Sequence, residues 1–339
     1  MKFSTIFLTS IFAFASSSPL LEKRNSYQGQ RYGGNEETIL IQINDNNEFY
    51  KQRNEQQVLG NQQIDLTVLN FALTLEFLEA TFYAQGLNQF SEERFLQEGF
   101  AGVRDQVELI SFHESTHVQF LQDTIRATFG QNQDVPTCRF NFDDALKDVT
   151  TMIATAGVLE KVGVAAYDGA ISLIQEDLFK TAGAAIATIE GRHAAALNII
   201  NRQLPVPNSF DTPLGLRSVI TLAAPFISGC DFELPAQPFQ SALTVKQSFC
   251  QLGQSIDLAF QGWRNQLSQQ LHCNFQVGIS HFRTPITLDV NNGNANCQVP
   301  EQLRGNFEAT VFVVCLDQDV GLTDDDHVVA GPTFLPLAL

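Results

Sequence analysis

The chain has 339 residues, enough for two ordinary domains, and its 20 Lys and Arg against 37 Asp and Glu give a formal net charge of −17. This acidic balance argues against binding to nucleic acid or anionic membrane surfaces, which attract basic patches, and it suits cationic partners such as metal ions. Charged residues make up 17% of the chain and hydrophobic residues 44%, so most of it is expected to fold.

The first 24 residues are typical of a secreted precursor. Lys2 precedes an apolar run, and Ala13-Phe14-Ala15 has the small-x-small pattern of a cleavage site, so residues 1–15 are predicted to be a signal peptide. Residues 16–24 end in the dibasic pair Lys23-Arg24 and are predicted to be a short pro-segment. We therefore expect a secreted, extracellular or cell-wall-associated protein without a membrane span after signal cleavage.

The part that follows is predicted to be a flexible arm and then a helical bundle. Residues 25–62 are rich in Asn, Gln, Gly and Glu, which is typical of a flexible arm. From Gln63 apolar residues recur at helical spacing, and four long helices joined by modest loops indicate a four-helix bundle. With a fifth helix added, this domain is assigned to residues 63–230, and its expected helices span residues 63–86, 101–129, 143–174 (with Asp143 as N-cap), 176–202 and 212–228.

Residues 231–339 are predicted to form a small β domain that contains disulfides. Pro residues separate five segments of strand-like composition: Leu243–Val245, Phe275–Ile279, Ile286–Val290, Phe307–Val314 and Val328–Leu335. The segment Ile256–Leu271 is equally compatible with a helix. An even number of cysteines in an oxidising compartment predicts disulfides, and the sequence alone leaves the pairing open among Cys138, Cys230, Cys250, Cys273, Cys297 and Cys315. The fold class is thus mainly α with a β-rich C-terminal part.

Each of the four long helices carries an acidic residue on an apolar face, and two of these acids are followed by His three residues later. Residues i and i+3 project from one face of a helix, so each Glu-x-x-His pair points the same way. One Glu from each of two helices and one Glu-x-x-His from each of the other two form the set of ligands that encloses two metal ions in a bundle core. The predicted ligands of two Fe or Mn ions are Glu76, Glu114, His117, Glu160, Glu190 and His193.

Taken singly, these residues are weak evidence, because a lone Glu in a helix most often faces solvent. Buried carboxylates without partners, however, would cost several kcal/mol apiece, and a metal compensates that cost. An internal repeat supports the site: Tyr83 and Tyr167 each follow a ligand Glu by seven residues, which places them on its face. They are predicted to pack in the core or to hold a ligand, and Glu79 is expected to lie beside the site.

His113-Glu114-Ser115-Thr116-His117 also matches the His-Glu-x-x-His signature of zinc metalloproteases. In that interpretation His113 and His117 bind zinc and Glu114 is the general base. It leaves Glu76, Glu160 and the second Glu-x-x-His pair without a role, so we rank it below the two-metal site, which leaves only His113 unexplained.

The chain resembles the secreted ferritin-like domain proteins of fungi, which include stress-response and sexual-development proteins and are related to plant and bacterial desiccation-related proteins. The resemblance covers roughly Asp65 to Pro235 and rests on residues 69–83, 159–167, 190–193 and 211–214. It implies a ferritin-like four-helix bundle. In ferritins and rubrerythrins the first-helix ligand lies seven residues before a Tyr, which matches Glu76 rather than Glu79. The resemblance also implies a Cys138–Cys230 disulfide.

Two classes of function follow from these expectations. In the first, the bundle binds two Fe or Mn ions and acts on oxygen or peroxide in stress or development. In the second, the protein is a non-catalytic cell-wall, matrix or stress-protective component that uses the bundle as a scaffold. All six predicted ligands are present, which favours metal binding. Protein partners and oligomeric state are left open by the sequence.

Overall fold

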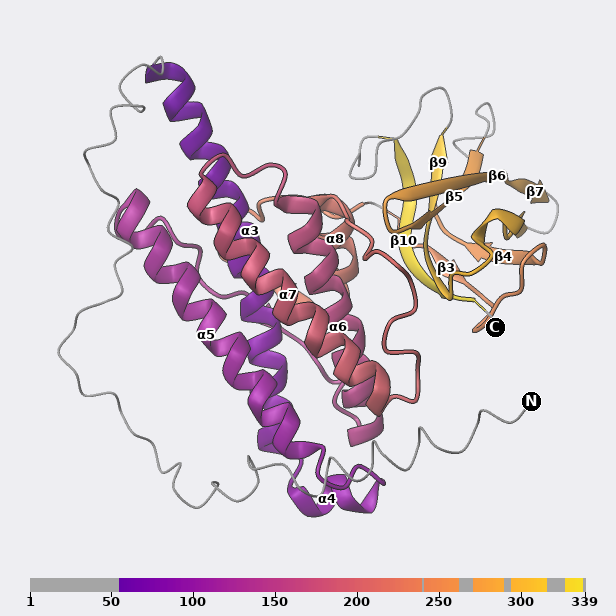
Figure 1. Ribbon diagram of the computed structural model, residues 1–339, viewed down its shortest axis with the longest axis horizontal. Coiled ribbons are helices and arrows are strands. Elements are labelled where there is room, and N and C mark those ends of the chain that lie inside the picture. The colour runs from indigo at the N-terminus through magenta and orange to yellow at the C-terminus, as the bar shows by residue number, and fades with distance from the viewer. Residues whose placement is uncertain (1–54, 240, 262–270, 290–293, 316–326, 338–339) are drawn as a thin grey trace. The chain divides into compact units, whose positions relative to one another are not determined.

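The computed structural model describes residues 55–239, 241–261, 271–289, 294–315 and 327–337 (Figure 1). The predicted signal peptide, the pro-segment and the arm as far as Asn54 lie outside the described residues. Four long helices form the bundle, with the short α4, Glu92–Gln97, in the connection after the first of them. They are α3 (Glu55–Gln89), α5 (Arg104–Phe129), α6 (Val149–Ala170) and α7 (Asp177–Ile200). Helix α3 packs against α5 and α6 against α7, and all four run side by side in Figure 1.

Among the four long helices, α3 and α6 begin farthest from their predicted residues, while α5 begins at Arg104, three residues later than predicted, and α7 at Asp177, one residue later. Helix α3 begins at Glu55 rather than Gln63, because residues 55–62 lack apolar periodicity but include the helix-favouring residues Glu and Gln. Helix α6 begins at Val149, and its N-cap is Asp148, whose Oδ1 accepts the backbone N–H of Thr151 at 2.6 Å. The predicted cap, Asp143, lies in a turn before the helix. The turn buries apolar side chains at steps of three and four residues, as a helix does, and this spacing led to the wrong prediction of the helix start.

Helix α6 is the central helix of the bundle. It is rich in Ala and Gly, and it buries residues on nearly every side along its length. By length and composition it is apolar enough to cross a membrane, but 67% of its most apolar window is buried inside the protein. It also carries Glu160 in its interior. These features are those of a core helix surrounded by other helices.

The predicted fifth helix is shorter than expected. Helix α8 spans Leu216–Ala223, and a 3-10 turn that contains Pro225 ends it, since Pro does not continue a helix. The next residues form β2, Ile227–Gly229, which pairs with β1, Arg139–Phe140, in the loop before α6. The Cys138–Cys230 disulfide lies beside this two-stranded sheet, and it is the pairing that the resemblance implied.

The C-terminal part contains two four-stranded antiparallel sheets in its described residues. One has the order β10-β9-β5-β6 and the other β3-β4-β8-β7. The bounds of the strands are β3 Thr244–Val245, β4 Ser255–Ala259, β5 Leu271–Val277, β6 Ser280–Pro285, β7 Thr287–Asp289, β8 Asn294–Gln298, β9 Glu308–Cys315 and β10 Val328–Pro336. The Cys273–Cys297 disulfide joins β5 to β8, and the two sheets share one apolar core.

Several features of this part differ from expectation or extend it. The beginning of Ile256–Leu271 belongs to strand β4 rather than to a helix, and residues 262–270 lie outside the described residues. Strands β6 and β8 were not predicted, because they are polar and lack the alternation of apolar and polar residues that indicates a strand. They are stabilised instead by pairing with neighbouring strands. Cys250 is buried and forms no disulfide with any cysteine whose side chain the structure describes. The side chain of Cys315 is outside the described part of the chain.

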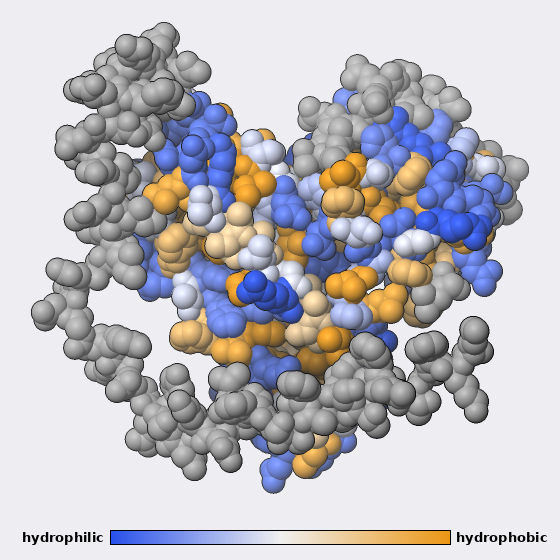
Figure 2. All heavy atoms as spheres, viewed as in Figure 1, coloured by the Kyte–Doolittle hydropathy of each residue, from blue (hydrophilic) through white to orange (hydrophobic). Residues whose placement is uncertain are grey.

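The sheets also contact the helices. Phe312 and Val314 of β9 are buried in the same core cluster as the bundle helices, and Lys161 of α6 forms an ion pair with Glu308 of β9. Some large apolar side chains are exposed, among them Phe112 at 65%, and Figure 2 shows apolar residues interspersed with hydrophilic ones on one face of the molecule. Scattered exposure of this kind is ordinary for folded proteins and carries no functional argument.

Candidate metal centre

The predicted ligands lie in the interiors of the four long helices and meet in the bundle core. Glu76 lies on α3 and Glu160 on α6, while α5 and α7 each supply one Glu-x-x-His pair. All four glutamates are buried, with exposed fractions of 1% or less. His193 is also buried, at 6%, whereas the His117 side chain is 12% exposed and lies nearer the surface.

These six residues form two overlapping clusters. The first contains Glu76, Glu114, His117 and Glu190; the second contains Glu114, Glu160, Glu190 and His193. Within each cluster, one candidate ligand atom per residue lies within 4.8 Å of the others. Glu114 and Glu190 belong to both clusters. The arrangement therefore has two shared carboxylates in the middle and one Glu with one His at each end.

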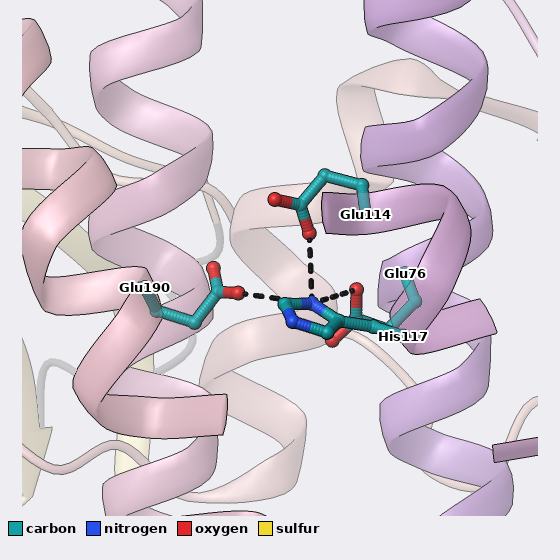
Figure 3. A group of neighbouring side chains, drawn as sticks. All are labelled: Glu76, Glu114, His117 and Glu190. Atoms are coloured by element: carbon teal, nitrogen blue, oxygen red, sulfur yellow. Dashed lines mark hydrogen bonds and ion pairs between the residues drawn. The ribbon is translucent and has the colours of Figure 1, made fainter. Parts of the chain in front are cut away.

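In each cluster the Nδ1 atom of the imidazole faces the carboxylates. His117 Nδ1 lies 3.2 Å from Glu76 Oε2, 3.2 Å from Glu114 Oε2 and 3.4 Å from Glu190 Oε1. Figure 3 shows this ring between the three carboxyl groups, with Glu190 reaching across from α7. In the second cluster, His193 Nδ1 lies 3.0 Å from Glu160 Oε2 and 3.1 Å from Glu114 Oε1.

The two tyrosines of the internal repeat bind the end glutamates crosswise. Tyr83 of α3 donates a hydrogen bond of 2.5 Å to Glu160 Oε1 of α6, and Tyr167 of α6 donates one of 2.5 Å to Glu76 Oε1 of α3. The sequence had placed each tyrosine on the same face as its own glutamate, and the structure pairs it with the glutamate of the other half. Each tyrosine therefore fixes one oxygen of an end glutamate and leaves Oε2 facing the cluster.

Glu79 lies beside the site, opposite a glycine of the other half. Position 163 of α6 corresponds in the repeat to position 79 of α3, and there the residue is Gly163. A Cβ atom at position 163 would lie 2.7 Å from Glu190 Oε2 and 3.2 Å from Glu79 Oε1. The glycine makes room for two carboxylates at once. A glycine inside a helix, which costs about 1 kcal/mol relative to alanine, is the sequence signal that would have drawn attention to it.

Burial and mutual repulsion raise the pKa of several of these acids. Desolvation, and then the charge of Glu160, raises the pKa of Glu79 and of Glu190 well above the usual range. The same two causes raise the pKa of Glu114 to about 7. The metal-free site therefore holds protons on part of its carboxylates at neutral pH.

The pKa values of His117 and His193 are shifted in the direction opposite to that expected from burial alone. Burial lowers the pKa of His117, but hydrogen bonds to Glu114 and Glu76 outweigh it and raise the pKa to about 10. For His193, burial is likewise outweighed by Glu114 and Glu160, and its pKa rises to about 9. Both imidazoles are thus protonated at neutral pH in the metal-free protein, where their charge offsets part of the carboxylate charge.

The shared carboxylates retain buried oxygens that have no hydrogen bond. Glu114 Oε1 and both oxygens of Glu190 have no hydrogen-bond partner among the described residues, although imidazole nitrogens lie within ion-pair distance of Glu114 Oε1 and Glu190 Oε1. Buried polar atoms without partners are costly, and a bound cation would satisfy them. Because these atoms belong to the two carboxylates that both clusters share, the residues present fit a pair of metal ions.

His113, which the sequence left unexplained, contacts the outer edge of the site. Its Nδ1 lies 2.9 Å from His193 Nε2, and the two rings are nearly parallel at an angle of 12°. His113 does not join His117 in either cluster, whereas the metalloprotease interpretation requires both to face one zinc ion. The sequence contains no signal that would have placed His113 against α7.

Residues 64–203 match the family described as the ferritin-like domain. The matched stretch spans most of α3 and all of α4 to α7, and it contains every residue of both clusters. No curated protein matches the chain. The helical part is therefore a ferritin-like domain, and two antiparallel sheets follow it.

Proposed function

We propose that this ferritin-like bundle binds two ions of iron or manganese and uses them in a reaction with dioxygen or peroxide. Glu76, Glu114, His117 and Glu190 would hold one ion, and Glu114, Glu160, Glu190 and His193 would hold the other. The observation that carries the proposal is the overlap of the two clusters through Glu114 and Glu190. A site for a single ion would not share its carboxylates with a second set of ligands.

The chemistry of the donors supports the choice of metals. Four carboxylates balance the charge of two divalent cations, and each ion would receive one imidazole nitrogen along with carboxylate oxygens. Carboxylate-rich sites with imidazole suit Fe and Mn, whereas thiolates, which select zinc and copper(I), are missing from both clusters. Bridging glutamates with Glu-x-x-His pairs are the di-iron and di-manganese arrangement of helical bundles.

When bound, the ions would supply one-electron redox chemistry toward dioxygen or peroxide. The protein's own groups would position the ligands and hold protons. Tyr83 and Tyr167 fix the end glutamates through their Oε1 atoms, and His113 contacts the Nε2 atom of His193. The four glutamates are buried from bulk solvent, while the partly exposed His117 lies on the side nearer to solvent.

We place the protein outside the cell. The leader pattern of residues 1–24 favours secretion, and the Cys138–Cys230 and Cys273–Cys297 disulfides are of the kind that persists in oxidising compartments. The resemblance to stress-response and sexual-development proteins favours a role in one of these processes, either in the medium or at the cell wall.

The direct test is metal loading of the secreted protein. After anaerobic incubation with Fe(II) or Mn(II) and desalting, we expect about two ions per chain, and the iron form should consume dioxygen or peroxide. The Glu114→Gln/Glu190→Gln double variant should fold and show neither property. A folded wild-type protein that stays metal-free would overturn the proposal and favour the scaffold function. One zinc ion together with peptide cleavage would favour the metalloprotease.

Metal binding should strengthen as pH rises. The ligands must be neutral imidazoles and carboxylates, yet the raised pKa values of His117 (about 10) and His193 (about 9) keep both imidazoles protonated at neutral pH. Below about pH 7, Glu114 must also lose a proton, which steepens the dependence. We expect the affinity for Mn(II) to rise at least about tenfold per pH unit, with protons released on binding. Calorimetric titrations in buffers of different ionisation enthalpy measure both effects, and a pH-independent affinity would contradict the assignment.

A further inference from the structure

A small apolar cavity lies in the layer of the bundle next to the proposed metal centre. Its volume is about 30 Å³, and all four long helices contribute to its lining. Among the lining residues, Ala72 lies four positions before Glu76, Leu121 four after His117, and Ile186 four before Glu190. Four residues of helix correspond to a rise of about 6 Å, so the cavity occupies the turn adjacent to the ligands on three helices.

Tyr167 connects this cavity to the ligands. Its ring belongs to the lining, while its hydroxyl group donates the 2.5 Å hydrogen bond to Glu76 Oε1. The half-buried members of the lining include Phe120 and Thr124 of α5 and Ala182 of α7. The cavity therefore has its ligand side at Tyr167, which is itself half-buried, as is Ile171 directly after α6.

The size and lining of the cavity restrict what it can hold. Thr124 and Tyr167 are among the lining residues, but no polar surface contributes to the wall of the cavity, so a water molecule would not find the two to four polar partners that ordered buried water requires. An engineered apolar cavity of about 150 Å³ binds benzene or xenon, and this one is about five times smaller. It is too small for an aromatic ring or an acyl chain, and its size suits a monatomic or diatomic apolar molecule.

We propose that this cavity admits dioxygen and delivers it to the metal centre, which makes dioxygen rather than peroxide the oxidant. Dioxygen is diatomic and apolar and needs no hydrogen bonds inside the cavity, whereas hydrogen peroxide would lose its hydrogen bonds to water on entry. The part of the proposal that concerns the oxidant rests on the proposed function, whereas gas binding by the cavity does not depend on metal.

Gly183 of α7 offers a substitution that fills the cavity. A Cβ atom at this position would lie 3.9 Å from its nearest neighbours, the side chains of Ile174 and Tyr167, so a small side chain fits without a clash. Gly183→Val would occupy the cavity, and Gly183→Ala, which adds only the Cβ atom, is the milder second variant should valine perturb folding. Ala184→Val is the matched control, because residue 184 is the next one on the same helix and is exposed.

Two measurements test the proposal. Xenon-129 NMR on the metal-free protein should show xenon binding to the wild type and to Ala184→Val, and loss of that binding in Gly183→Val. In the Fe(II)-loaded proteins, Gly183→Val should slow oxidation by dioxygen at least about tenfold and change oxidation by hydrogen peroxide less than about twofold, with an unchanged metal content.

Each part of the proposal fails in its own way. No xenon binding by the wild type would overturn the cavity as a gas site, whatever the metal content. Xenon binding that is lost in Gly183→Val without any change in the dioxygen rate would overturn its role in oxidant delivery. A wild type that binds xenon but takes up no metal would overturn the proposed function, and with it the assignment of the oxidant, while the gas site would stand.

Discussion

Glu114→Gln is expected to remove both metal ions, whereas Glu76→Gln is expected to remove only one. Glu114 belongs to both clusters, while Glu76 belongs only to the cluster with His117. Glutamine keeps the shape of the side chain and loses the charge and one of the two oxygen ligands. Metal analysis after loading and desalting should give close to no ions for the first variant and about one for the second, against about two for the wild type.

The same variants should differ in stability according to the presence of metal. In the metal-free protein, Glu114→Gln removes the buried charge that pairs with His117 and His193, so the variant should be less stable than the wild type. With metal at about a thousand times its Kd, the wild type should gain about 4 kcal/mol in the free energy of unfolding for each bound ion, or about 8 kcal/mol for two, a gain that the variant should lack. Thermal melts with and without Mn(II) measure both.

Glu108→Gln is the matched control for these experiments. Glu108 is on α5, as Glu114 is, but its side chain is 49% exposed and pairs with Arg104. It should retain both ions and its metal-dependent stabilisation. If Glu114→Gln kept two ions, or if Glu76→Gln lost as many as Glu114→Gln, the assignment of Glu114 to both ions would be wrong.

Removal of the Cys138–Cys230 disulfide should lower the free energy of unfolding more than removal of the Cys273–Cys297 disulfide. The bridge joins residues 92 positions apart, and a loop of this length corresponds to about 4.5 kcal/mol in the chain-entropy model. The Cys273–Cys297 bridge, with a separation of 24, corresponds to about 3.5 kcal/mol. Denaturant unfolding of the two double Cys→Ser variants should show this order. An equal or reversed order would indicate that the bridges act on the folded state rather than on the unfolded chain.

The longer bridge also affects the proposed metal centre. The chain between Cys138 and Cys230 contains α6, α7 and α8 and supplies Glu160, Glu190 and His193. Without this bridge, metal retention should fall at temperatures where the wild type still holds its ions. The Cys273→Ser/Cys297→Ser variant is the control, because its loop contains none of these ligands.

The course of the helices was largely predictable, because it depends on local patterns. Apolar residues at steps of three and four identified the four long helices, and residues i and i+3 placed each Glu and its His on one face. The boundaries were less predictable. The turn before α6 buries Phe142 and Leu146 as a helix would, so its apolar spacing concealed Asp148 as the true cap. In the C-terminal part, the polar strands β6 and β8 form because they pair with neighbouring strands. Their own composition does not indicate this pairing.

The sequence by itself determined which residues are candidates for the metal centre, because burying one acid on each of four apolar helices is costly unless those acids act together. Only the tertiary structure decided which of these residues belong to each cluster. It placed Glu114 and Glu190 in both clusters, paired Tyr83 with Glu160 and Tyr167 with Glu76, and set Gly163 opposite Glu79. The reason is physical: helical periodicity fixes the direction of a side chain about its own helix axis, whereas partners on different helices depend on the rotation and height at which the helices pack.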